Sequence, residues 1–109
     1  SDLPTDTTWI AATGYRIQIS VSPTRDQAED IAEVARQRFP YDSVYVYFQA
    51  PWHKVRIGDL DSRQTAKEKM NEARQKGYRE AFLVPSEIRV MEFIHEDGNA
   101  VFIDDARSR

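Results

Sequence analysis

The 109-residue sequence contains no cysteine, which excludes disulfide bonds, thiolate nucleophiles and cysteine-ligated metal sites. It has no run of about 18 apolar residues, the length that a membrane-spanning helix needs, and no basic segment leading into an apolar core as in a signal peptide. A chain of this length is expected to form one domain. We interpret it as an excised soluble domain and expect its signal, anchor or partner domain to lie upstream.

The sequence also lacks a strong charge of either sign. Its formal net charge is −3 and its isoelectric point is ≈ 5.3. Such a chain has no long-range attraction for nucleic acid or for anionic lipid, so a polyanionic partner would need a local basic patch. The composition therefore favours a neutral or weakly charged ligand.

Catalytic motifs are missing as well. The sequence has no GxSxG, P-loop or GxGxxG motif, and neither Ser20 nor Ser22 has the His and Asp partners of a hydrolase. The two histidines, His53 and His95, are not clustered with other metal-ligating residues. We therefore predict a protein that is not an enzyme, with no metal and no cofactor.

What the sequence does contain is an internal repeat. When the chain is shifted by 38 positions, it matches itself without a gap over a whole strand–helix–strand unit. Arg25 meets Arg63 and Ala28 meets Ala66, and the apolar strand positions also coincide, as with Ile17 and Val55. The chain is therefore expected to consist of two similar halves.

Each half predicts a strand, a helix and a second strand. Alternating polarity predicts strands over residues 14–22, 44–49, 53–58 and 81–85, whereas helical periodicity predicts helices over residues 24–39 and 62–76. Thr24 and Gln27 have the spacing of a capping box, and Pro40 and Gly77 are expected to end the two helices. Asp59 and Asp61 are interpreted as turn and helix-start residues.

Two such halves joined by a tight turn predict a ferredoxin-like split βαβ fold of the α+β class. This βαββαβ arrangement has a four-stranded antiparallel sheet with both helices on one face. We expect a linker over residues 1–13 and the domain over residues 14–86, with halves at 14–49 and 52–86. Residues 87–109 are expected to form an extension, with an extra C-terminal β-hairpin around the turn at 96–99 and a frayed end.

The sheet face without helices, which we call the open face, is where function is expected. Strand alternation places Phe82 on the helix side and Leu83 on the open face. It also assigns to the open face the polar and aromatic residues Arg16, Gln18, Ser20, Tyr45, Tyr47, Lys54 and Arg56. These side chains suit a ligand with hydroxyls, amides and apolar CH faces, as in amino sugars, but they also suit an ordinary solvated sheet face. Trp52 in the connecting turn is expected to pack on the core edge or to contact a ligand.

Residues 14–20 (GYRIQIS) and 51–60 (PWHKVRIGDL), followed by Ser62, Ala66 and Gly77, resemble the SPOR-domain pattern over about residues 14–86. The resemblance implies a periplasmic or cell-envelope module that binds peptidoglycan glycan strands stripped of stem peptides, which accumulate at division septa. It implies ligand-binding roles for Gln18, Ser20, Trp52 and Arg56, whereas Arg16, Tyr45, Tyr47 and Lys54 are assigned to the site by strand alternation.

Two other functions use the same fold. An RNA-binding module of the RRM type has this topology, but its aromatic residues lie on the first and third strands, where this chain has Arg16, Gln18, Lys54 and Arg56. A protein-interaction or small-molecule regulatory domain is compatible with the fold as well. Both remain open at the level of the sequence.

Overall fold

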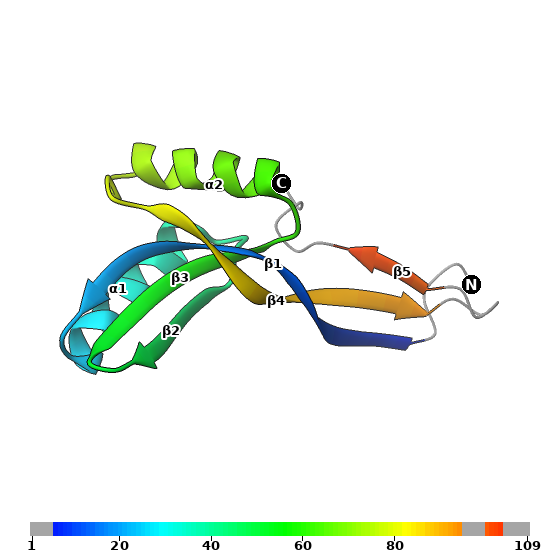
Figure 1. Cartoon of the computed structure of the whole chain (residues 1–109), viewed down its shortest axis with the longest axis horizontal. Coiled ribbons are helices and arrows are strands. Elements are labelled where there is room, and N and C mark those ends of the chain that lie inside the picture. Colours follow the sequence, from blue (N-terminus) through cyan, green and yellow to red (C-terminus); the bar gives the residue numbers. More distant parts are fainter. Residues whose placement is uncertain (1–5, 95–99, 104–109) are drawn as a thin grey trace.

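The computed structural model of the protein describes residues 6–94 and 100–103, with side chains over residues 8–91. In chain order its elements are β1 (Asp6–Ser22), α1 (Arg25–Arg38), β2 (Val44–Gln49), β3 (Trp52–Leu60), α2 (Arg63–Gln75), β4 (Phe82–Ile94) and β5 (Ala100–Ile103). The strands form one antiparallel sheet in the order β2-β3-β1-β4-β5 (Figure 1). The predicted βαββαβ fold is confirmed.

Both helices begin and end as their sequences predict. The Thr24 hydroxyl accepts a hydrogen bond from the Gln27 backbone N–H at 3.2 Å, and the Ser62 hydroxyl accepts one from the Thr65 N–H at 3.1 Å. Each cap satisfies a backbone donor that the first helical turn leaves unpaired. At the end of α2, Gly77 adopts a φ of 108°, which costs glycine less than any other residue.

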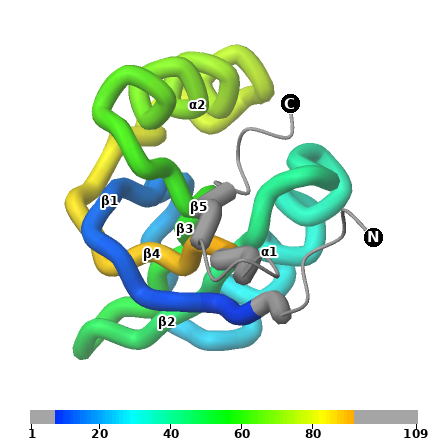
Figure 2. Tube along the Cα trace, turned by 90° about the vertical axis from the view of Figure 1, so that its right-hand side faces the viewer, coloured from blue at the N-terminus to red at the C-terminus, as the bar shows by residue number. Residues whose placement is uncertain are grey.

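The hydrophobic core lies between the helices and one face of the sheet. Fully buried alanines allow the helices to approach the strands closely, and they include Ala35 on α1 and Ala73 on α2. Both alanines belong to one cluster with Ile17 of β1 and Ile57 of β3, so both helices cover the same sheet face. Viewed along the long axis of the molecule, α1 and α2 are seen packed against the strands (Figure 2).

The 38-residue repeat is visible in the packing. Arg38, after which α1 ends, donates from Nη1 to the Lys76 carbonyl at 3.5 Å, and Lys76 donates from Nζ to the Arg38 carbonyl at 2.6 Å. The two residues are 38 positions apart and cap each other's helix end. The halves are therefore related in space as well as in sequence.

Two bulges in the central β1–β3 pair disturb the simple alternation. Gln18 lies opposite Arg56, but Ser20 lies opposite Val55, so Ile19 is an extra residue on β1. The Ser20 hydroxyl is consequently buried, next to the helix-facing Val55, and the prediction that Ser20 lies on the open face is wrong. The residue after the bulge that does face outward is Val21, which is 48% exposed.

The alternation assigned to the fourth strand is also wrong. Leu83 lies opposite Ile17 and packs in the core, whereas Phe82 lies opposite Gln18 and is 45% exposed. Residues directly opposite each other in an antiparallel pair share a face, so the partner strand determines the orientation. Phe82 is therefore on the open face and Leu83 on the helix side.

The strands β1 and β4 are longer than predicted. Residues 6–13, expected to be a linker, belong to β1 and pair with β4 from Asp6↔Ile94 onward. Strand β4 does not end at Pro85, because β4 is an edge strand at that point and an edge tolerates a residue without an N–H. Residues 6–14 of β1 and 86–94 of β4 pair in an extension of the sheet, here called the ribbon, which projects beyond the helices (Figure 1).

The ribbon leaves the sheet at Gly14. A Cβ atom at this position would lie 2.4 Å from the Leu60 carbonyl oxygen and 2.5 Å from Cδ1 of Ile88. Only glycine allows β1 to pass this close to β3 and β4.

The C-terminal strand agrees with the expected hairpin in its pairing. Residues Ala100–Ile103 lie antiparallel to the end of β4, from Met91↔Ile103 to Ile94↔Ala100. The first strand of this hairpin is the ribbon part of β4 rather than a separate element. The turn expected at 96–99 and the frayed end expected at 104–109 lie outside the described residues.

Candidate functional site

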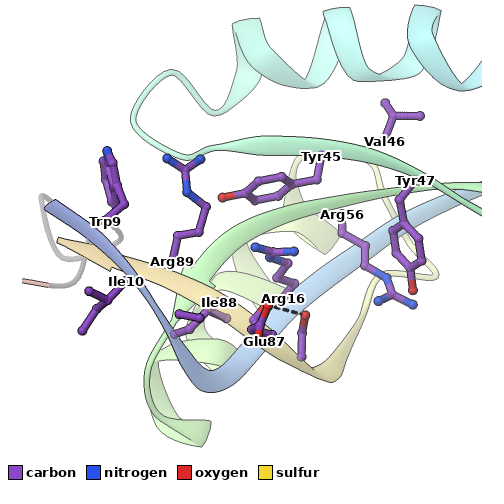
Figure 3. A pocket seen from close by; sticks show the side chains of 12 residues that line it. Trp9, Ile10, Arg16, Tyr45, Val46, Tyr47, Arg56, Glu87, Ile88 and Arg89 are labelled. Atoms are coloured by element: carbon purple, nitrogen blue, oxygen red, sulfur yellow. Dashed lines mark hydrogen bonds between the residues drawn. The ribbon is translucent and has the colours of Figure 1, made fainter.

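A pocket of about 470 Å³ lies between the open face and the ribbon. Strands β2 and β3 and the central part of β1 contribute Arg16, Tyr45, Val46, Tyr47 and Arg56, and the ribbon contributes Trp9, Ile10, Ala11, Ser86, Glu87, Ile88 and Arg89 (Figure 3). Four of the eight residues predicted for the site, Arg16, Tyr45, Tyr47 and Arg56, are thus brought together in one pocket.

Asp59 connects the strands beneath this pocket. Its side chain is almost fully buried, and its Oδ1 accepts hydrogen bonds from Nη2 and Nε of Arg16 at 3.0 and 3.3 Å. Oδ1 also accepts from the Arg89 backbone N–H at 2.9 Å, and Oδ2 accepts from the Tyr45 hydroxyl. The second bulge, at Gly58 with a φ of 83°, turns Asp59 toward this face. The sequence predicted Asp59 to be a turn residue, and this is wrong. Its carboxylate instead forms hydrogen bonds with β1, β2 and the ribbon.

Tyr45 is held by the same carboxylate. Burial raises the pKa of the Tyr45 hydroxyl, and the hydrogen bond to Asp59 raises it further. The hydroxyl therefore keeps its proton and remains a donor. The Arg16 guanidinium lies over the Tyr45 ring at 3.8 Å from the centroid, so both side chains have a fixed orientation.

Arg56 is positioned differently, since no acidic side chain of residues 8–91 pairs with it. Its Nε donates to Oε1 of Gln18 at 2.9 Å, and its guanidinium lies over the Tyr47 ring at 4.4 Å from the centroid. Burial lowers the pKa of Arg56, although an arginine remains charged at neutral pH. Gln18 is only 5% exposed, so its main role in this structure is to orient Arg56.

The residues of the central row show how the face is built. Tyr45 lies opposite Arg56, Arg56 opposite Gln18, and Gln18 opposite Phe82, so the row crosses all four strands of the domain. Aromatic side chains stand at both ends of the row and polar ones in the middle. This order offers flat apolar surfaces beside hydrogen-bonding groups.

The ribbon wall was not predicted from the sequence. Trp9 is 45% exposed, and the Arg89 guanidinium lies over its ring at 4.6 Å from the centroid. The signal for this wall is present in residues 7–10 (TTWI), which are β-branched or aromatic residues typical of strands.

Four predicted residues do not line the pocket: Gln18, which contacts Arg56 as described above, and Ser20, Lys54 and Trp52. The Ser20 hydroxyl is buried next to Val55, as described above. Lys54 lies opposite Tyr47 and donates from Nζ to Oε1 of Gln49 at 2.5 Å. Trp52 is 45% exposed at the turn, four residues along β3 from Arg56, or roughly 13 Å at the rise of a strand. The open face therefore continues from the pocket past Lys54 to Trp52.

The chemistry of this surface is that of binding. Stacked arginine–tyrosine pairs can contact sugar rings, hydroxyls and carbonyl groups. Over the residues that the structure describes, no group of three or more His, Asp or Glu side chains could hold a metal ion. Within the same residues, no helix is long and apolar enough to cross a membrane.

Comparison with known proteins identifies one family. The family model described as SPOR domain matches residues 11–85, which is more than half of the 109-residue chain. The match includes Arg16, Gln18, Asp59 and Arg56 and ends within β4 at Pro85. No curated protein and no solved structure matches the chain.

Proposed function

The chain belongs to the SPOR domain family, and we propose that it binds peptidoglycan glycan strands that lack stem peptides. Members of this family are non-catalytic modules that generally bind peptidoglycan, which implies a location in the cell envelope.

The observation that carries the proposal is the pocket on the open face. Tyr45 and Tyr47 present aromatic rings, and Arg16 and Arg56 present planar donors at fixed positions beside them. An amino-sugar strand offers CH faces for the rings and hydroxyl and acetamido groups for the donors. Lys54 and Trp52, farther along the same face, extend the contact surface to further sugars of the strand.

The ribbon supports the preference for strands without peptides. Trp9 and Arg89 stand beside the open face and form one wall of the pocket. A stem peptide attached to the sugar in the pocket would have to pass this wall, whereas a bare glycan fits along the sheet. Removal of the peptides is therefore expected to increase binding.

The proposal is tested by sedimenting the domain with sacculi treated with an amidase that removes stem peptides. Tyr47→Ala is expected to weaken binding by about tenfold, because an aromatic ring at the centre of a binding surface contributes about 1.4 kcal/mol or more. Tyr41→Ala is the matched control, since Tyr41 is 76% exposed and lies outside the pocket. Equal sedimentation of both variants would remove the pocket from the binding site.

The same proposal includes targeting of the parent protein to division septa, where amidases produce denuded strands. An exported fluorescent fusion of the domain is expected to concentrate at septa, and the Tyr47→Ala fusion is expected to be spread over the envelope. Uniform fluorescence of the unaltered domain would argue against septal targeting. It would leave open a protein-interaction role on the same fold.

A further inference from the structure

The positive charge of Arg56 is not neutralised within the described part of the chain. The neighbouring Arg16 forms an ion pair with Asp59 at 3.0 Å, but over residues 8–91 no carboxylate forms an ion pair with Arg56. Its one hydrogen-bond partner there is the neutral amide oxygen of Gln18. A guanidinium whose hydrogen-bond partner is neutral keeps its full charge and can bind an anionic group of a ligand.

The surroundings of Arg56 also define what such a ligand group would be. Nε is occupied by Gln18, and the Tyr47 ring covers one face of the guanidinium. The terminal N–H groups therefore remain for an acceptor in the plane of the guanidinium. A carboxylate is the group whose two oxygens match this fork, and its charge would be partly shielded from water in the pocket.

We propose that Arg56 binds the carboxylate of the lactyl group on muramic acid, the group that stem-peptide removal creates. This inference rests on the proposed binding of denuded glycan. In the peptide-removing reaction, water breaks the amide C–N bond, the peptide leaves as an amine, and the lactyl carbonyl becomes a carboxylic acid that ionises at neutral pH. An intact strand has a neutral amide at this place and cannot neutralise Arg56.

The other charged groups of the pocket are less suited to this role. Arg16 is already paired with Asp59, and Arg89 is exposed on the ribbon, where it stacks on Trp9. Glu87 also lines the pocket but is exposed and forms no ion pair with Arg56. Arg56 therefore combines partial burial, a fixed orientation and an uncompensated charge.

The test compares two synthetic glycans of two GlcNAc–MurNAc repeats, one with lactyl carboxylates and one with lactyl N-methylamides, by isothermal titration calorimetry. The unaltered domain is expected to bind the acid about tenfold more tightly than the amide, as for a charge-assisted, paired hydrogen bond. Arg56→Gln is expected to bind both glycans with the same, weaker affinity. Arg79→Gln removes an equal charge from an exposed residue outside the pocket and should retain the preference.

The two titrations distinguish the contact between Arg56 and the carboxylate from glycan binding as such. Equal affinity of the unaltered domain for acid and amide would overturn the carboxylate contact while glycan binding stands. A preference that survives in Arg56→Gln would also overturn it, because another group would then supply the charge. Absence of binding to either glycan would contradict both proposals.

Discussion

Gln18 Oε1 accepts a hydrogen bond from Arg56 Nε at 2.9 Å, and these residues are separated by 38 positions, the offset of the internal repeat. They are thus equivalent positions of the two halves, and they face each other in the central β1–β3 pair. The first half has the neutral amide of Gln18 at this position, and the second half has the guanidinium cation of Arg56. A nearly symmetric scaffold therefore presents two different side chains at equivalent positions of its central strands.

The Gln18–Arg56 contact gives the first prediction. Gln18→Glu places a carboxylate beside Arg56 and neutralises it within the protein, so the ligand's carboxylate loses its partner. The affinity for the acid glycan is expected to fall by about tenfold, and the affinity for the amide glycan by much less. Calorimetry with both glycans measures the difference. An undiminished preference for the acid would show that this contact does not govern the charge of Arg56.

Asp59 is predicted to be the main electrostatic support of the pocket. Asp59→Asn removes the charge that pairs with Arg16, leaving the cation partly buried, and is expected to lower the free energy of unfolding by about 3 kcal/mol. Chemical denaturation measures this change. Asp30→Asn is the matched control, because Asp30 is exposed on α1 and its loss changes the net charge equally. Similar stability of the two variants would contradict the role assigned to Asp59.

Trp52 is predicted to contact ligand rather than to support the fold. Because its side chain is 45% exposed, Trp52→Ala is expected to change the free energy of unfolding by less than about 0.5 kcal/mol. Binding to long denuded strands is expected to weaken about fivefold, whereas binding to a short glycan that fills only the pocket should not change. A large loss of stability would assign Trp52 to the core edge instead.

Glu72 on α2 gives a prediction on acid stability. Burial alone would raise the pKa of Glu72, but hydrogen bonds from Lys69 and Lys76 outweigh it and hold the pKa below the usual value for a glutamate. A lowered pKa in the folded state stabilises the protein above the unfolded-state value, and this contribution is lost as the pH falls through the folded-state value.

Thermal unfolding between about pH 6 and about pH 3 measures this contribution. The melting temperature of Glu72→Gln is expected to fall less across this range than that of the unaltered protein. Glu68→Gln, at an exposed position of the same helix, is the control and should follow the unaltered protein. Identical pH profiles for all three proteins would contradict the prediction.

The topology could be predicted because the sequence signals for helix ends and buried helix faces are all consistent with the βαββαβ fold. The caps at Thr24 and Ser62, the stop at Gly77 and the buried alanines of both helices all follow from spacing and residue type. The repeat then fixed the relation between the two halves. These features depend on neighbours in the sequence, which a single sequence contains.

The wrong predictions concern the sheet face on which a side chain lies, where pairing with a strand distant in the sequence determines the orientation. The bulge at Ile19 reverses the side on which Ser20 lies, and the pairing of Gln18 with Phe82 reverses the alternation assigned to β4. The predicted strand over residues 81–85 stops at Pro85, whereas β4 continues through this proline into the ribbon. Whether a proline ends a strand depends on whether that strand lies at the sheet edge, which is a property of the assembled sheet.

Recognition of denuded glycan is tested by sedimenting the unaltered domain with intact sacculi before and after an amidase removes the stem peptides. A larger bound fraction is expected after treatment, and this preference is expected to decrease at high salt as the contact with Arg56 is screened. Equal binding before and after treatment would contradict the specificity for denuded strands. An absence of binding in both samples would contradict glycan recognition by this domain.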